Sequence, residues 1–127
     1  MPFFTFGQNN SGGSFVTNDS VAEYVIVEAD NANAANSIAD DIGIYFNGVE
    51  DGIDCDCCGD RWYRVNDRDA DQEPNIYGKH PAEQEYHCFV YYSTGFVDEF
   101  NHPVKHVRAA EQTAIGRSTI LGIESKD

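Results

Sequence analysis

Runs of apolar residues divide the first half of the chain into strand and helix candidates. Residues 3–6 (FFTF) and 24–27 (YVIV) are short runs rich in aromatic and β-branched residues, which favour strands. The second run is apolar throughout, as in a strand that is covered on both faces. The apolar spacing then changes to i, i+3, i+4 and i+7, in a stripe formed by Ala35, Ile38, Ala39 and Ile42. This spacing predicts an amphipathic helix with Asp30 as its N-cap and Gly43 at its end.

Small polar residues mark the predicted turns of the N-terminal half. The insert GQNNSGGS, residues 7–14, separates the first strand from the apolar residues Phe15 and Val16, so it predicts a hairpin connection. A phosphate-binding loop is the alternative, but the insert has no Lys and matches neither GxxxxGK[ST] nor GxGxxG. Residues 44–46 (IYF) predict another strand, which ends at Asn47 and Gly48.

The C-terminal half contains a long acidic segment, a hairpin pattern and a helix pattern. Residues 50–73 are rich in acids and are better suited to a loop with a short strand than to a helix. Residues 88–100 (CFVYYSTGFVDEF) predict a hairpin that turns at Thr94 and Gly95. Pro103 can open a second helix that ends at Gly116, with an apolar face of Val104, Val107, Ala110, Ala114 and Ile115.

These elements predict an α+β fold. A small antiparallel or mixed sheet packs against one short Ala-rich helix and against a second, C-terminal helix. The length of 127 residues is that of a single domain, so residues 1–127 are expected to share one core.

The charge of the chain narrows the classes of ligand. There are 22 Asp and Glu against 8 Lys and Arg, for a formal net charge of -14, and residues 1–60 contain eleven acids and no Lys or Arg. Phosphate backbones and anionic membranes are bound by cationic side chains, so neither is expected as a direct ligand. A basic protein, a divalent cation or simple solubility remain as explanations for the acids.

Targeting signals are not expected from the sequence. The N-terminus MPFFTFGQNN has neither the basic nor the apolar region of a secretory signal, and no apolar stretch approaches the length of about 18 residues that a membrane helix needs. A reducing cytoplasm is therefore the expected setting of the cysteines, where stable disulfides are uncommon.

Three of the four cysteines lie in GIDCDCCGDRWYRV, residues 52–65. The C-x-x-C-G pattern within it is half of a zinc knuckle, and a closed zinc site needs four ligands. The candidate ligands for zinc are Cys55, Cys58, Cys88 and His87, with Cys57 as an alternative to His87. The adjacent His87 and Cys88 would point apart in an extended strand, so packing of the thiols beside Trp62 is the favoured interpretation. A disulfide or redox pair is the third alternative.

Acids and histidines elsewhere form weaker candidate sites. Asp67, Asp69 and Asp71 imitate the first ligands of a calcium loop, but Gln72 stands at the glycine position and Gly78 at the glutamate position, which favours a solvated acidic loop. His102 and His106 follow Asp98 and Glu99, which suggests a metal or acid–base group. Neither HExxH nor a Ser/His/Asp arrangement is present, so surface histidines are favoured.

Four sequence blocks together resemble a family of short proteins of tailed bacteriophages that has no assigned activity. They are FTFGQNNSGGSF, EYVIVEADNANAANSIADDIGIYFNG, DCDCCGDRWYR and EPNIYG, within residues 3–78. The resemblance implies a phage product in the host bacterial cytoplasm or in the virion. It transfers no catalytic residue to this chain.

The function expected from these observations is binding rather than catalysis. No paired-carboxylate, phosphate-cradle or nucleophile motif is present, so an enzyme is not expected. The leading hypothesis is an acidic accessory protein that binds a host nucleic-acid-binding or defence protein, because an array of carboxylates can mimic a phosphate lattice. One alternative is a minor virion component, a decoration or tail-associated protein that assembles by strand addition to the flat N-terminal strand. The other alternative is a protein that sequesters a small ligand such as a nucleotide beside Trp62, Arg61 and Arg64.

Overall fold

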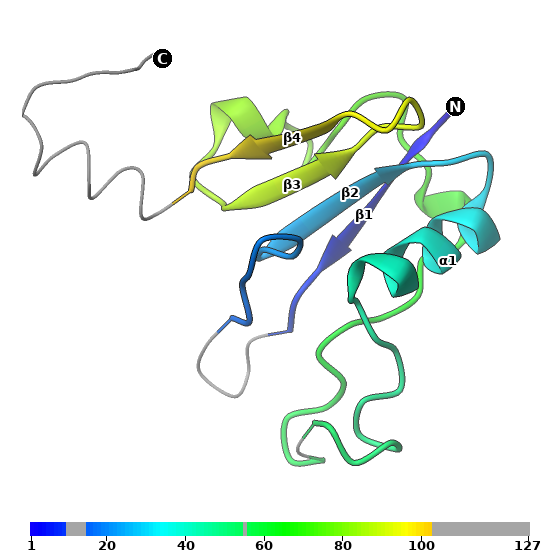
Figure 1. Ribbon diagram of the computed structural model, residues 1–127, viewed down its shortest axis with the longest axis vertical. Coiled ribbons are helices and arrows are strands. Elements are labelled where there is room, and N and C mark those ends of the chain that lie inside the picture. The colour runs from blue at the N-terminus through cyan, green and yellow to red at the C-terminus, as the bar shows by residue number, and fades with distance from the viewer. Residues whose placement is uncertain (10–14, 55, 103–127) are drawn as a thin grey trace, which may run out of the picture.

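The computed structural model describes residues 1–9, 15–54 and 56–102. They form a four-stranded mixed sheet in the order β1-β2-β3-β4, with one α-helix packed on it (Figure 1). The elements are β1 (Phe3–Gly7), β2 (Tyr24–Glu28), α1 (Ala32–Ile42), the 3-10 helices η1 (Asp67–Asp69) and η2 (Pro81–Glu83), β3 (Cys88–Tyr91) and β4 (Val97–Phe100). The predicted α+β fold is confirmed, whereas the predicted helix that opens at Pro103 lies outside the described residues.

Strand β2 is the centre of the sheet. It pairs with β1 in antiparallel fashion and with β3 in parallel fashion, and β4 returns antiparallel to β3. Because β2 and β3 are parallel, the chain between them must cross from one end of the sheet to the other, and α1 and the long segment after it make this crossing. Val25, Ile26 and Val27 have no exposed surface, which confirms a strand covered on both faces.

The partner of β1 differs from the sequence prediction. Residues 15 and 16 form no strand, and β1 pairs instead with β2, where Phe4 lies opposite Val27. The side chain of Gln8 replaces the predicted strand contact: its Nε2 donates to the carbonyl of Val16 at 2.6 Å and its Oε1 accepts from the amide of Val16 at 2.9 Å. One amide side chain therefore satisfies the backbone of Val16 without a ladder.

The boundaries of α1 confirm one predicted cap and correct the other. Asn31, not Asp30, is the N-cap, and its side chain accepts from the amide of Ala34 at 2.9 Å. Gly43 ends the helix as predicted, with a φ of 122° that favours glycine. The predicted strand at residues 44–46 is wrong: Ile44 follows the cap directly and is 1% exposed in the core, so its side chain is buried although its backbone does not join the sheet.

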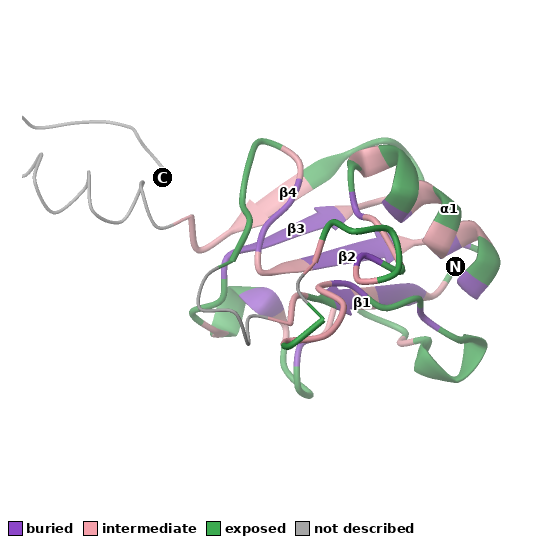
Figure 2. Ribbon diagram, turned by 90° about the horizontal axis from the view of Figure 1, so that it is seen from below, coloured by how far each residue is buried: buried purple, intermediate pink, exposed green. Residues whose placement is uncertain are grey.

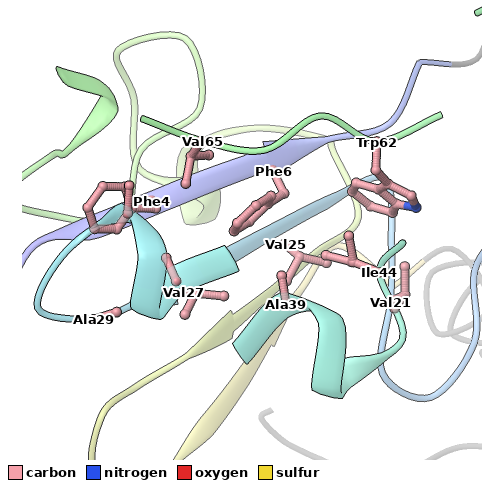
Figure 3. Packing of buried hydrophobic residues seen from close by; sticks show 12 residues of the cluster. Phe4, Phe6, Val21, Val25, Val27, Ala29, Ala39, Ile44, Trp62 and Val65 are labelled. Carbon is pink, nitrogen blue, oxygen red and sulfur yellow. The ribbon is translucent and has the colours of Figure 1, made fainter. Parts of the chain in front are cut away.

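Each face of the sheet has its own apolar cluster. Between the sheet and α1, the buried residues include Phe4, Phe6, Ile44, Trp62 and Val65. Figure 3 shows them in one cluster with Ala39 of the helix. The opposite face holds Phe3, Ile26, Ile76, Cys88 and Val90. Figure 2 shows buried segments along the strands and exposed segments on the outer side of α1 and its neighbouring loops.

Candidate functional site

The cysteine-bearing loop is held in shape by its acids. Asp54 accepts from the hydroxyl of Tyr45 through Oδ1 and from the amide of Arg61 through Oδ2, both at 2.8 Å. Asp60 accepts from the amide of Val49 at 2.9 Å. Burial raises the pKa of Tyr45, and the hydrogen bond to Asp54 adds to this, so the tyrosine stays a donor at neutral pH. These two carboxylates therefore have structural partners and do not point to a shared cation.

The structure separates the cysteines of the predicted zinc set. Cys57 takes part in a disulfide, Cys58 is a free and partly exposed thiol, and Cys88 is a free thiol with no exposed surface. Burial raises the pKa of the Cys88 thiol to about 12, so it stays protonated at neutral pH when no ion is bound. Among the described residues, neither Cys58 nor Cys88 belongs to a group of potential ligands close enough to share an ion, and Cys55 lies outside them.

His87 and Cys88 face opposite sides of the sheet. Cys88 lies in the apolar cluster on the face away from α1, and side chains alternate along an extended chain. The ring of His87 packs instead against that of Phe89, with centroids 5.4 Å apart. The two residues therefore cannot converge on one ion without a change of the strand.

The predicted small-ligand residues also diverge. Trp62 is 2% exposed and is a core residue, so its ring is not available to a ligand at the surface. The guanidinium of Arg61 reaches Gln8, with Nη1 3.1 Å from Oε1. Arg64 alone remains at the surface, where its guanidinium lies 4.8 Å from the centre of the Phe46 ring.

The three aspartates of the predicted acidic loop have local structural partners. Asp67 accepts at 2.8 Å from the amide of Ala32 at the start of α1, and Asp69 accepts at 2.8 Å from the amide of Asn66. Asp71 exchanges two backbone hydrogen bonds with Phe3, at 2.8 and 2.9 Å. The segment therefore joins the N-terminus of α1 to the edge of β1, while Asp67 and Asp69 stay exposed to solvent.

The backbone of this segment also covers the outer edge of β1. Besides the pair between Phe3 and Asp71, the hydroxyl of Thr5 donates to the carbonyl of Asn75 at 2.7 Å. An added strand at β1, the assembly route expected for a virion component, would have to displace these contacts. The geometry does not favour this route.

The outer side of α1 is polar and acidic. A groove of about 520 Å³ runs along it, lined by Asn33, Asn36, Ser37, Asp40, Tyr45, Phe46, Asn47, Asp51 and Arg64. Two of the lining residues, Asp40 and Asp51, are exposed acids. We call the exposed acids of α1 and of the segments that precede, follow or contact it the α1 acidic face: Asp30, Asp40, Asp41, Glu50, Asp51, Asp67 and Asp69. Within the described ranges, the carboxylates that form ion pairs are Asp54 and Glu99, which both lie outside this face.

A different cluster brings two histidines and a carboxylate together. The Nε2 of His87 lies 2.8 Å from Oε2 of Glu99, and the Nε2 of His102 lies 3.7 Å from the same oxygen. The two imidazole rings are 4.9 Å apart between centroids. The sequence indicated Glu99 and His102 as a candidate group but missed His87 as their partner. Only the register of the β3–β4 hairpin places His87 beside Glu99, and the spacing of residues in the sequence did not reveal this register.

Comparisons with known proteins identify a family for most of the chain. DUF7296, described as a domain of unknown function, matches residues 1–109. No curated protein and no solved structure matches the chain. No helix in the described part of the chain has the length and apolar character needed to cross a membrane.

Proposed function

The chain belongs to the DUF7296 family, and we propose that it is a non-enzymatic protein that binds the basic surface of a partner protein through the α1 acidic face. The observation that carries this proposal is the state of the carboxylates on that face. They are exposed, and the ion pairs of the described residues lie elsewhere. Arg64 and Arg68 are the cations beside these seven acids, so the face keeps a net negative charge that acts on the surroundings of the protein.

The face also has a fixed geometry. Asn36 exchanges two hydrogen bonds with the backbone of Val65, at 2.9 and 3.1 Å, and Asp67 binds the first turn of α1. The helix and the segment at residues 65–69 are therefore held together, and so are the carboxylates that they carry. A fixed array of charges loses little conformational freedom on binding, which favours affinity for a complementary surface.

The partner is best matched by a protein that normally binds nucleic acid. Such proteins carry Lys and Arg that neutralise successive phosphates. Carboxylates in a fixed array offer the same cations an alternative set of anions, and association is steered by the opposite charges of the two surfaces. The resemblance to tailed-phage proteins supports a bacterial host protein as the partner and the host cytoplasm as the compartment.

The test is capture of partners from a bacterial lysate with matched charge variants. One variant removes three charges from the α1 acidic face by Asp40→Asn, Asp41→Asn and Asp51→Asn. The control removes three exposed charges elsewhere by Glu73→Gln, Glu83→Gln and Glu85→Gln. Both variants have the same net charge, so a difference between them reports the position of the charges and not their number.

We expect the wild type and the control to retain a basic protein at low salt, and the face variant to lose it. Moving from low salt to about 0.5 M should release the partner from the wild type, because surface charges are screened at that ionic strength. Equal loss of the partner by both variants would contradict the proposal, because the effect would then follow net charge alone.

A further inference from the structure

The cluster of His87, Glu99 and His102 is assembled by the β3–β4 hairpin. Glu99 lies opposite Phe89 in the antiparallel register, so it is a diagonal neighbour of His87 on the same face of the sheet. Figure 1 shows that β4 ends beside the start of β3, and the three residues belong to or directly adjoin these two strand ends. The two strands thus place an imidazole and a carboxylate together by pairing alone.

Asn101 then turns the chain so that His102 joins them. Its φ is 60°, in the left-handed region that asparagine tolerates better than most residues. Its Nδ2 donates to the carbonyls of Pro81 and Tyr86, at 3.0 and 3.1 Å. This turn is anchored to the segment that leads into β3, so the position of His102 is part of the fold.

We propose that His87, Glu99 and His102 bind one first-row divalent transition metal ion, with zinc as the expected ion. Two imidazoles and one carboxylate are a ligand set that zinc uses in sites with three protein ligands and one open position. Calcium and magnesium prefer sites made of oxygen ligands, so the two nitrogens select against them.

The distances between the three donors fit such an ion. Zinc lies about 2.0–2.2 Å from nitrogen and oxygen ligands, so two ligands of a tetrahedral site are roughly 3.3–3.5 Å apart. The observed separations from the Glu99 oxygen are 2.8 Å to His87 and 3.7 Å to His102, and all three donors lie within 4.8 Å of one another. The two separations from Glu99 are each within about 0.7 Å of this range, and the two histidine donors would have to approach each other by up to about 1.5 Å to complete the site.

One of the two neutral tautomers of His87 can present Nε2 to an ion. The residue is 6% exposed, and its buried Nδ1 has no hydrogen-bond partner within the described part of the chain. No described group donates a hydrogen bond to Nδ1, so the proton of the neutral ring is not forced onto Nε2. The neutral ring can donate from Nε2 to Glu99 when no ion is present, or give the Nε2 lone pair to an ion with the proton on Nδ1, where the buried N–H then has no acceptor among the described residues.

The charge around the cluster also favours a cation. Glu23 immediately precedes β2 and His87 immediately precedes β3, and the amide of Tyr24 donates to the carbonyl of His87 at 3.3 Å, so the two residues are neighbours at the paired strand starts. Glu23 and Glu99 together supply two negative charges near the position of a divalent ion. A bound ion would thus be neutralised locally, which limits the cost of holding charge in a half-buried place.

Cobalt(II) titration followed by visible absorption and native mass spectrometry tests the site. We expect one ion per chain, with the spectrum of nitrogen and oxygen ligands and without the near-ultraviolet charge-transfer band that a thiolate ligand gives. Loss of a residue that only hydrogen-bonds to a metal ligand already lowers metal affinity about 10–100-fold, so His102→Ala and Glu99→Gln should each weaken cobalt and zinc binding at least that much. His102 and Glu99 are partly exposed, so both variants should stay folded by circular dichroism.

His80→Ala is the matched control, because this imidazole packs against Phe100 and lies outside the cluster. It should bind cobalt as the wild type does. A thiolate band would overturn the proposal by placing the ion at the cysteines. Unchanged affinity in His102→Ala and Glu99→Gln, or no retained ion in the wild type, would also overturn it and leave an internal hydrogen bond as the only role of the cluster. The result is independent of the partner-binding proposal.

Discussion

Replacing Asp67 by alanine should loosen the start of α1, although Asp67 lies far from the helix in sequence. Its carboxylate accepts from the amide of Ala32 at 2.8 Å, and this amide is one of those that a helix leaves without an internal partner. Asn31 satisfies a different amide, that of Ala34, at 2.9 Å. The two caps therefore act in parallel, and loss of one is not made good by the other.

The magnitude follows from two contributions. A hydrogen bond to a charged acceptor contributes about 1.5–3 kcal/mol, and a carboxylate at a helix N-terminus adds about 0.3–1 kcal/mol. Asp67 is exposed as a residue, so solvent reduces both, and we expect Asp67→Ala to lower the free energy of unfolding by about 1–2 kcal/mol. Asp67→Asn keeps a hydrogen-bond acceptor but loses the charge, so it should lower the free energy of unfolding by roughly half as much as Asp67→Ala does.

Urea denaturation followed by circular dichroism measures these changes, and thermal unfolding should show a fall of roughly 3–6 °C per kcal/mol for a domain of this size. Asp30→Ala is the control, because this exposed acid precedes the N-cap and was the cap predicted from sequence. It should change stability by less than about 0.5 kcal/mol. A larger loss for Asp30→Ala than for Asp67→Ala would refute the reasoning about which carboxylate holds the helix.

Three further predictions concern the core. Trp62→Ala should lower the free energy of unfolding, measured by urea denaturation, by about 3–5 kcal/mol, because it empties a buried aromatic site. A loss below about 1 kcal/mol would show that the indole is not packed as described. Peptide mapping after iodoacetamide treatment at pH 8 should find Cys58 labelled and Cys88 unlabelled in the folded protein, since the pKa of Cys88 is about 12; rapid labelling of Cys88 would contradict its burial. Finally, burial raises the pKa values of Tyr24 and Tyr45 above 10, so the folded state retains their protons longer than the unfolded state. Stability should be intact below pH 10 and fall as the pH rises above it, and a flat profile in urea titrations up to pH 11 would count against this.

Local patterns predicted those parts of the fold that depend on nearby residues. The apolar run at residues 24–27, the helix stripe that ends at Gly43 and the turn at Gly95 each carry their signal within a few positions. The pairing of β1 with β2 was not predictable in this way, because the polar insert suggested a short hairpin. The side chain of Gln8 satisfied the backbone of Val16 instead, and nothing in local spacing indicates such a contact.

The candidate sites show the same limit. The cysteine cluster attracted attention because its spacing is local, yet the alternation of His87 and Cys88 across the sheet separates the proposed ligands. The cluster of His87, Glu99 and His102 needed the strand register and the left-handed turn at Asn101. The hairpin itself was predicted, so its register was within reach of the sequence. The turn at Asn101 that brings His102 back to the cluster could not be predicted from the sequence.

The central claim, that the α1 acidic face is the binding surface, is tested most directly by mapping backbone amide shifts in nuclear magnetic resonance spectra during titration with the captured basic protein. We expect the amides of Ser37, Asp40 and Asp51 to shift at low salt and to return towards their free positions when salt is added. The amides of Glu83 and Glu85, exposed acids away from this face, should stay unchanged. Shifts centred on residues 83–85, with α1 unaffected, would contradict the claim.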